Sequence, residues 1–332
     1  MRRDTTNYEN CSALSKNEPP VADGIKKPMK KGGYSDSGAD IAYCLKENGE
    51  DVILPCENPD IYNDYDWVFP DTKEGIEQAI KKGADTFWLN TVLYDSHQIV
   101  LFKGVCIVGQ RPGDVSKYDD KFYTNDCLRR EGLSVVLEQL VVKAENYTGG
   151  FPCIIKPVRG RDSQGVSKCD TPEQMYFDLS KAIENRKYGN KMIAEEFLCG
   201  NEITFAVFPN AVSLPVVERF SHAGGIAPYS GDVPVSQNSR VAACEDENMT
   251  AIRSECEKAV KILDLKGLVR IDCRADKSGR YKIFDFNMKP NMTGSVRPHR
   301  KNQSSLVAIA AESVGMSFYG LLLKMIDCKW KM

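Results

Sequence analysis

Histidine and net charge are both scarce in this sequence. It has three histidines and a formal net charge of −2 over 332 residues. The histidines lie too far apart along the chain for their spacing to suggest a zinc site. So small a net charge does not favour nucleic acid or an anionic membrane as a partner. No apolar run of about 18 residues occurs either, so we expect no membrane-spanning helix.

Cys-x-x-Cys pairs are also missing, although the chain has 12 cysteines. Several of them, such as Cys106, Cys153 and Cys273, lie in segments expected to form core strands. We therefore interpret them as buried free thiols rather than as a disulfide framework. The first residues lack the apolar segment of a secretory signal. Both features predict a cytoplasmic protein.

The pattern of apolar runs and turn residues predicts an α/β (α+β) fold of several units, because one core rarely serves 332 residues. Residues 1–30 are polar and rich in lysine, which predicts a flexible tail. Short apolar runs within 31–115 are typical of buried parallel strands and predict an N-terminal α/β domain. A central domain is expected over 116–200 and a C-terminal domain over 201–332.

Helix-start and helix-end signals divide these domains further. "DTKEGIEQAIKKGA" predicts a helix capped by Asp71. Thr171, followed by Pro172, predicts the start of another. An apolar stripe predicts a third helix over 246–263, and "SLVAIAAESVGMSFYGLLLKMI" predicts a single helix over 305–326.

The last two expected strands, "LVRIDCRA" and "YKIFDFN", are joined by the short turn "DKSG". Because side chains alternate along a strand, Arg270, Asp272 and Arg274 share one face of the first strand. Asp285 and Asn287 share a face of the second, with its two phenylalanines opposite. Carboxylate and amide oxygens suit Mg²⁺ carried by a polyphosphate. The alternative, from spacing alone, is the ordinary solvent-facing side of a hairpin.

A second segment, "CIIKPVRGRDSQGVSK", is an apolar strand that ends at Lys156, followed by a loop with Gly160 and Gly165. Such a loop can fold its backbone amides over phosphates while the lysine neutralises them. It is not a Walker loop, because Val166 and Ser167 stand where lysine and serine or threonine are required. A plain surface turn is the alternative. The acids after the next strand, in "IAEEFLCGNEI", would by themselves be expected to face water.

Together these segments resemble the ATP-grasp superfamily, most closely its D-alanine–D-alanine ligase branch. The resemblance is clear from about Asp119 to the C-terminus and faint before it. It rests on "DDKFYTNDCLRREGL", "IIKPVRGRDSQGVSK", "AEEFLCGNEITFAV", "GLVRIDCRA" and "IFDFNMKPNMTGS", in that order. It implies an ATP-grasp fold, with an N-terminal parallel α/β domain, a small central domain and a C-terminal catalytic domain with a mixed sheet.

The resemblance also implies roles for individual residues. Lys121 and Lys156 would contact the phosphates of ATP, together with Ser163 in the loop between Gly160 and Gly165. Glu195 and Leu198 would contact the adenine, and Glu202 the ribose. Two Mg²⁺ ions, or Mn²⁺ in their place, would bind Asp272, Asp285 and Asn287. Arg270 would contact the transferred phosphate and the oxyanion, and the backbone amide near Asn291 would be a second oxyanion donor.

The sequence departs from the family pattern mainly where substrates bind. Asp285 replaces a glutamate, and Pro290–Asn291 replaces Pro-Gly. The N-terminal glutamate loop, the His-Gly motif and the Lys-Tyr of the closing loop are not recognisable, and "LNTVLYDSHQI" stands in the region of the first two. Synthesis of D-alanyl-D-alanine is therefore not expected.

The implied reaction joins a small-molecule acid to an amine through an acyl phosphate. A small-molecule kinase and a non-catalytic nucleotide-binding protein are the alternatives, since one fold hosts many functions. Ser295, Arg297 and His222 are expected to bind substrate, although "SVRPHRK" could be a solvated basic turn and His222 an incidental loop residue. The sequence gives no oligomeric state, and a homodimer is compatible with it.

Overall fold

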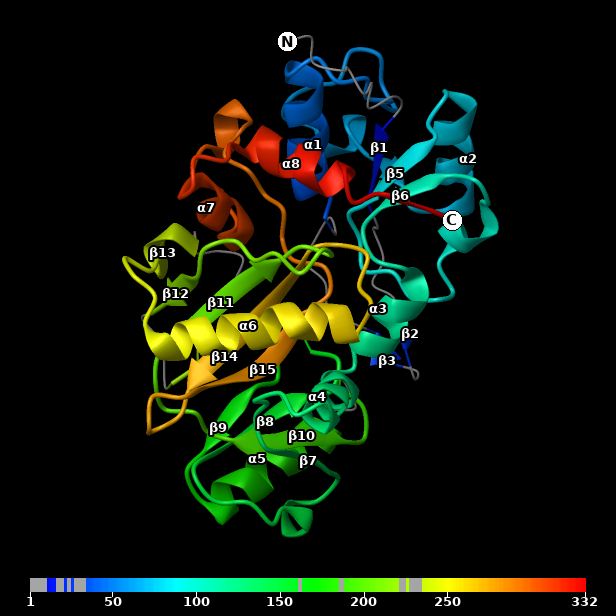
Figure 1. Ribbon diagram of the computed structural model, residues 1–332. Coiled ribbons are helices and arrows are strands. Elements are labelled where there is room, and N and C mark those ends of the chain that lie inside the picture. The colour runs from blue at the N-terminus through cyan, green and yellow to red at the C-terminus, as the bar shows by residue number, and fades with distance from the viewer. Residues whose placement is uncertain are drawn as a thin grey trace.

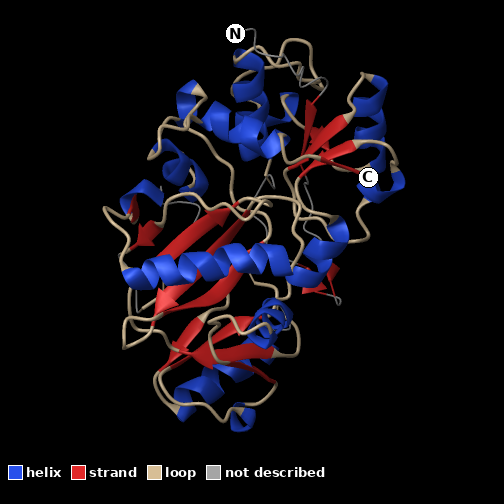
Figure 2. Ribbon diagram, viewed as in Figure 1, coloured by secondary structure: helices blue, strands red, loops and turns tan. Residues whose placement is uncertain are grey.

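The computed structural model describes residues 11–15, 21–22, 25–26, 34–160, 163–184, 188–220, 225–226 and 235–332. Its three larger sheets, each with helices packed on it, are arranged one after another along the long axis of the molecule (Figures 1 and 2). The N-terminal sheet lies at one end, the sheet beneath helix α6 (Glu247–Ile262) in the middle and the small central sheet at the other end.

The N-terminal sheet has the strand order β16-β6-β5-β1-β4. Its strands are β1 (Cys11–Ser15), β4 (Phe69–Pro70), β5 (Thr86–Leu89), β6 (Cys106–Val108) and β16 (Trp330–Lys331). The pairs β1–β4, β1–β5 and β5–β6 are parallel, as predicted, whereas β16 runs antiparallel to β6. Helices α1 (Ser35–Glu47) and α2 (Lys73–Lys81) connect the parallel strands.

Strand β1 corrects the expectation of a flexible tail over residues 1–30. Cys11, Ala13 and Leu14 are buried, and β1 pairs with strands on both sides. A five-residue strand carries too short a pattern to stand out among the polar residues around it. The segment expected to supply the first strand, "DVILP", contributes only an isolated bridge from Val52 to Cys11.

The central sheet is antiparallel, with the order β7-β10-β8-β9. Its strands are β7 (Glu138–Val141), β8 (Cys153–Pro157), β9 (Ser167–Cys169) and β10 (Met192–Glu196). Helix α5 (Pro172–Glu184) packs on it through Met175 and Leu179. Thr171 Oγ1 accepts a hydrogen bond from Gln174 N at 3.3 Å, which confirms the predicted N-terminus of this helix. Helices α3 (Pro112–Tyr118) and α4 (Lys121–Arg130) precede the sheet.

The C-terminal sheet is also antiparallel, with the order β13-β12-β11-β14-β15. Its strands are β11 (Glu202–Val207), β12 (Val217–Arg219), β13 (Ser239–Val241), β14 (Val269–Ala275) and β15 (Tyr281–Asn287). Helix α6 covers one face and buries Ile252, Cys256 and Val260, the stripe predicted from the sequence. The opposite face is left for polar side chains.

The last helical segment differs from its prediction. It forms two helices, α7 (Leu306–Glu312) and α8 (Phe318–Ile326), not one. Gly315 has a φ of +73°, a left-handed conformation that ends a helix, and Ser317 Oγ accepts from Gly320 N at 3.1 Å to begin the next. The remaining described strands, β2 (Val21–Ala22) and β3 (Ile25–Lys26), pair with each other.

Helix α2 differs in its cap. Thr72 Oγ1 accepts from Gly75 N at 3.2 Å, so Thr72 is the cap instead of Asp71. Asp71 is buried and lies 3.2 Å from His97 Nε2. All 12 cysteines are free and six are buried, as expected. Within the described ranges, no helix has the length and apolar character needed to cross a membrane.

Candidate functional site

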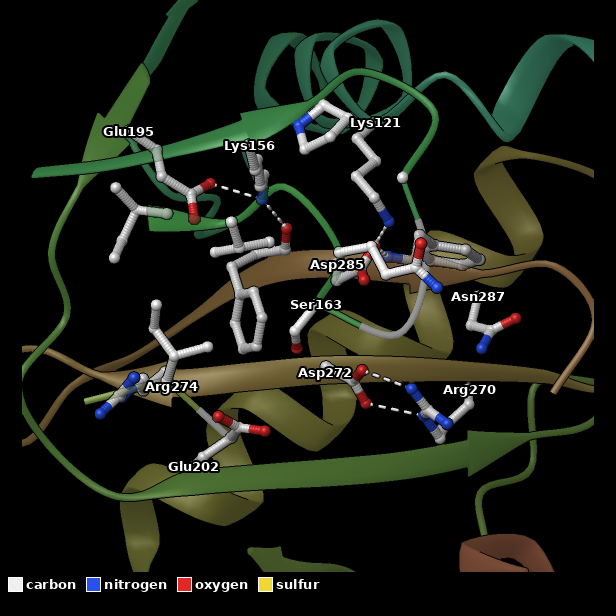
Figure 3. A pocket seen from close by; sticks show the side chains of 18 of the residues that line it. Lys121, Lys156, Ser163, Glu195, Glu202, Arg270, Asp272, Arg274, Asp285 and Asn287 are labelled. Atoms are coloured by element: carbon white, nitrogen blue, oxygen red, sulfur yellow. Dashed lines mark hydrogen bonds and ion pairs between the residues drawn. The ribbon is translucent and has the colours of Figure 1, made fainter. Parts of the chain in front are cut away.

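A cavity of about 180 Å³ opens between the central and the C-terminal sheets (Figure 3). Strands β8 and β10 line it from one side, and β11, β14 and β15 line it from the other. All the predicted nucleotide and metal residues line it: Lys121, Lys156, Ser163, Glu195, Leu198, Glu202, Arg270, Asp272, Asp285, Asn287 and Asn291. Residues from all five motifs quoted above, 170 positions apart at the extremes, therefore meet around one space.

The register of β14 and β15 produces the predicted polar face. Asp272 lies directly opposite Asp285, and Arg270 lies directly opposite Asn287. Arg270 and Asp272 are both nearly inaccessible, at 9% and 5% exposure. The solvent-facing hairpin, which spacing alone left open, is thus wrong for these residues.

One residue of β15 departs from simple alternation. The register shifts between Asp272 and Cys273, so that Asp272 pairs with Asp285 while Cys273 pairs with Ile283. Phe284 is the extra residue of this bulge, and it lines the cavity instead of facing away from it as predicted. Ile283 and Phe286 both stay in the core, which is what the bulge makes possible.

Asp272 is held by hydrogen bonds from its own strand, β14, and from the neighbouring strand β11. Arg270 Nε donates to Asp272 Oδ1 at 2.9 Å, and Arg270 Nη2 donates to Oδ2 at 2.7 Å. Thr204 Oγ1, from β11, donates to Oδ1 at 2.6 Å. A bidentate pair of this kind fixes the plane of both groups, so the carboxylate and the guanidinium are oriented before any ligand arrives.

The opposite carboxylate, Asp285, forms an ion pair with Lys121 at the start of α4. Burial would raise the pKa of Asp285, but the charges of Lys121 and Lys156 outweigh it and lower the pKa to about 2. Asp285 is therefore ionised at neutral pH, the state in which a carboxylate can bind a cation.

Lys156, on β8, has only 5% of its surface exposed. Its Nζ lies 2.6 Å from Glu195 Oε2 and donates to the carbonyl of Phe284 at 2.9 Å. Burial would lower the pKa of Lys156, but Glu195 and Asp285 outweigh this effect and raise it. Burial raises the pKa of Glu195 in turn, although Lys156 opposes the change. The lysine is thus kept as a cation inside the cavity.

Glu202 lies in a row of charges that crosses the C-terminal sheet. Its cross-strand partners are Arg219 on β12 and Arg274 on β14. Arg219 Nη1 is 3.7 Å from Glu202 Oε1, and both side chains are buried. Arg274 Nε donates to the carbonyl of Gly200, in the segment that joins β10 to β11, at 3.1 Å. Sequence reasoning missed Arg219, because nothing local reveals which strand β12 will pair with.

Lys289 and Tyr34 were also missed, and both line the cavity. Lys289 Nζ lies 3.2 Å from the centre of the Tyr34 ring. The lysine had a signal in the sequence, as the cation two residues beyond Asn287. Tyr34 had none, because it joins the cavity only through the packing of the N-terminal domain.

Two of the three predicted substrate residues lie elsewhere. Arg297 is fully buried, with Nε 2.7 Å from Asp40 and Nη1 2.7 Å from Asp64. It joins the loop after β15 to the N-terminal domain and does not line the cavity, so the expectation of a substrate contact is not met. Ser295 Oγ lies 2.7 Å from Ser304 Oγ and is likewise absent from the lining. His222 falls outside the described residues.

The cavity offers a metal ion two carboxylates and one amide oxygen. Among the described residues, no group of three or more histidine, cysteine, aspartate or glutamate side chains could hold a metal unaided. Asp272, Asp285 and Asn287 therefore form an incomplete set of hard oxygen donors. Such a set fits Mg²⁺, which usually takes one or two carboxylates and completes its shell with water and substrate phosphates.

In this protein two antiparallel sheets enclose a cavity lined by lysines and paired acids, which is the arrangement of the ATP-grasp class of folds. Comparison with known proteins agrees. The family described as D-ala D-ala ligase C-terminus matches residues 126–327, more than half of the chain. The chain therefore belongs to the D-alanine–D-alanine ligase family, which confirms the resemblance inferred from the sequence.

Two relatives show how far the similarity extends. D-alanine–D-alanine ligase B of Chromobacterium violaceum is 28% identical over 218 residues, 63% of this chain and 66% of the relative. D-alanine–D-alanine ligase of Acinetobacter baumannii is 30% identical over 186 residues, 54% of each chain. The chain thus matches between about half and two thirds of the length of these curated relatives.

Solved structures confirm the fold over nearly the whole chain. D-alanine–D-alanine ligase from Bacillus anthracis, complexed with ATP, has a TM-score of 0.68 at 18% identity and covers 96% of both chains. The VanG D-Ala:D-Ser ligase from Enterococcus faecalis has a TM-score of 0.66 at 17% identity, covering 96% of this chain and 99% of its own.

Proposed function

We propose that this protein is an ATP-dependent carboxylate–amine ligase that forms an amide or peptide bond through an acyl-phosphate intermediate. The observation that carries the proposal is the convergence of Lys121, Lys156 and Arg270 with Asp272 and Asp285 around one cavity. Phosphoryl transfer needs positioning and charge neutralisation more than covalent help, and these residues supply both.

The nucleotide would lie along the cavity from the segment that joins β10 to β11 as far as β15. Glu195 and the backbone near Leu198 would hold the adenine, Glu202 the ribose and the two lysines the phosphates. Lys121 and Lys156 already lie against acids of the cavity, so their cationic ends point to the same region. Bound to Asp272, Asp285 and Asn287, Mg²⁺ would supply further positive charge to neutralise the polyphosphate.

The acid substrate would attack the γ-phosphate with a carboxylate oxygen, giving an acyl phosphate and ADP. The amine would then attack the acyl carbon, lose a proton and expel phosphate. Arg270 would stabilise the charge on the transferred phosphoryl group and on the tetrahedral oxyanion, with the backbone amide near Asn291 as a second donor. The bidentate pair with Asp272 holds Arg270 in place for this task.

The acid and the amine differ from those of D-alanyl-D-alanine synthesis in this proposal. The expected family motifs for substrate are missing from the sequence, and Arg297 is engaged by Asp40 and Asp64. The 12 free cysteines favour a reducing compartment, so we place the reaction in the cytoplasm.

The test is a screen of acid and amine pairs for ADP release with Mg²⁺ and ATP, with product masses read alongside. A ligase gives ADP only when both substrates are present, and a product lighter by one water than the sum of the pair. ADP with a phosphorylated acid and no amine requirement would instead show a kinase. ATP binding without ADP release from any pair would show a non-catalytic protein.

A further inference from the structure

A second, smaller chamber adjoins the main cavity at the carboxyl ends of β5 and β6. It has room for about 30 Å³ and shares Val115, Met288 and Lys289 with the lining of the main cavity. In the N-terminal sheet β1 has β4 on one side and β5 on the other, so the chain reverses its strand order between β1 and β5. Ligands of open α/β sheets bind at the carboxyl ends of strands at such a point.

Two buried polar side chains of the chamber have unused hydrogen-bonding capacity. Asn90 is fully buried and Thr91 is 2% exposed. Asn90 Nδ2 donates to the carbonyl of Tyr34 at 2.7 Å and to Ser37 Oγ at 3.0 Å, which fixes the orientation of the amide. Among the residues that the structure describes, neither Asn90 Oδ1 nor Thr91 Oγ1 has a hydrogen-bond partner. Buried polar atoms are rarely left unpaired, so a partner from outside the chain is expected here.

The charge of the chamber restricts that partner. Of the described residues that line it, Lys289 alone is charged, and most of the others are apolar, such as Trp88, Leu268 and Met325. A buried ammonium would lie near a cation without a carboxylate to compensate it. A carboxylate would meet the lone pairs of Asn90 Oδ1. A hydroxyl satisfies both sides, because it can donate to Asn90 Oδ1 and accept from Thr91 Oγ1.

We propose that this chamber receives a hydroxyl group of the acid or of the amine, and that Asn90 and Thr91 select substrates bearing one. The assignment rests on the proposed ligase function, because it places the chamber beside the reaction centre at the end of β15. The chamber holds about one water-sized group. It therefore recognises a short hydroxyl-bearing substituent and excludes a longer one.

The test measures binding to the full chain with Mg²⁺ and a non-hydrolysable ATP analogue, by isothermal titration calorimetry. The probes are lactate against propionate as acids, and ethanolamine against ethylamine as amines; each pair differs by one hydroxyl. The hydroxyl-bearing member of one pair should bind at least about 10-fold more tightly than its partner, because its hydroxyl pairs with buried polar atoms that the other member leaves unpaired. Thr91→Val, which removes the hydroxyl at nearly constant volume, should abolish that preference.

Two further variants make the result specific. Thr91→Ser keeps the hydroxyl and should keep the preference. Ser12→Ala removes a buried hydroxyl of the same sheet that lines neither cavity and has no hydrogen-bond partner within the described ranges. It should change nothing. Equal affinities within both pairs, or no binding of either hydroxyl-bearing probe, would overturn the proposal. So would a preference that survives Thr91→Val, which would mean that the chamber holds a bound water only. Failure to bind the ATP analogue would count against the ligase function, whereas nucleotide binding without a hydroxyl preference counts against the chamber alone.

Discussion

Asp285→Asn separates two roles of one side chain, because it removes the charge and keeps the shape. In the protein without ligand, Asp285 compensates two lysines, Lys121 and Lys156. With ligand it would bind the metal. The substitution should therefore lower both the stability of the free protein and the rate of ADP release.

The size of the stability effect follows from the pKa of Asp285, which falls from 3.8 to about 2 in the folded protein. That difference corresponds to about 2 kcal/mol of unfolding free energy. It is an upper value, because the side chain is 26% exposed. Because the pKa of Asp285 is lower in the folded than in the unfolded protein, its contribution to stability is fully present at pH values above the unfolded pKa. The gap between wild type and variant should thus be constant from pH 7 to about 4 and shrink as the pH falls toward 2.

Urea unfolding at pH 7 measures this gap, with Glu57→Gln as a control that removes an exposed acid elsewhere. Lys121→Met and the double variant complete a cycle, which should show a coupling of at least about 1 kcal/mol between Lys121 and Asp285. In the ADP assay, kcat should fall about 100-fold or more, because metal charge stabilisation is worth several kcal/mol. An Asp285→Asn protein as stable as wild type would refute the electrostatic reasoning, and near-normal kcat at saturating Mg²⁺ would refute the metal assignment.

Three other substitutions test neighbouring conclusions. Lys156→Met should weaken ATP binding about 10-fold by calorimetry with little effect on adenosine, if the charge of Lys156 serves the phosphates as proposed; an equal loss of affinity for both would make Lys156 a structural residue. Arg297→Met should lower the free energy of unfolding by about 3 kcal/mol, because it removes one of the two guanidinium groups, Arg297 and Arg300, that pair with buried Asp40. Unchanged stability with reduced kcat/KM would restore Arg297 as a substrate ligand. Burial raises the pKa of Glu138 to about 7. The stability that the neutral carboxyl contributes is therefore fully present below pH 4.5, and it is lost as the pH rises through 7. Glu138→Gln should thus equal wild type in urea unfolding at pH 4.5 and exceed it by up to about 3 kcal/mol at pH 8; a gap that does not grow with pH would contradict this.

The sequence alone determined the features that depend on neighbouring residues. The alternation of side chains along a strand placed Arg270 with Asp272 on one face of β14, and Asp285 with Asn287 on one face of β15. That Asp272 lies opposite Asp285 depends on the bulge, because the register beside the turn would place Asp272 opposite Phe284. Thr171 identified the start of its helix because capping is a contact across three residues. The order of the motifs identified the family, since each motif is a short segment with its own chemistry.

Only the tertiary structure decided the features that depend on packing between distant segments. Arg297 lies 257 residues from Asp40, and no local rule could indicate that a buried carboxylate would engage it. Arg219 meets Glu202 because of strand pairing, and Phe284 enters the cavity because a bulge shifts the register. Local propensity fixes which way side chains point along one element. The partners that they meet are set by which elements pack together, and that is a property of the whole chain.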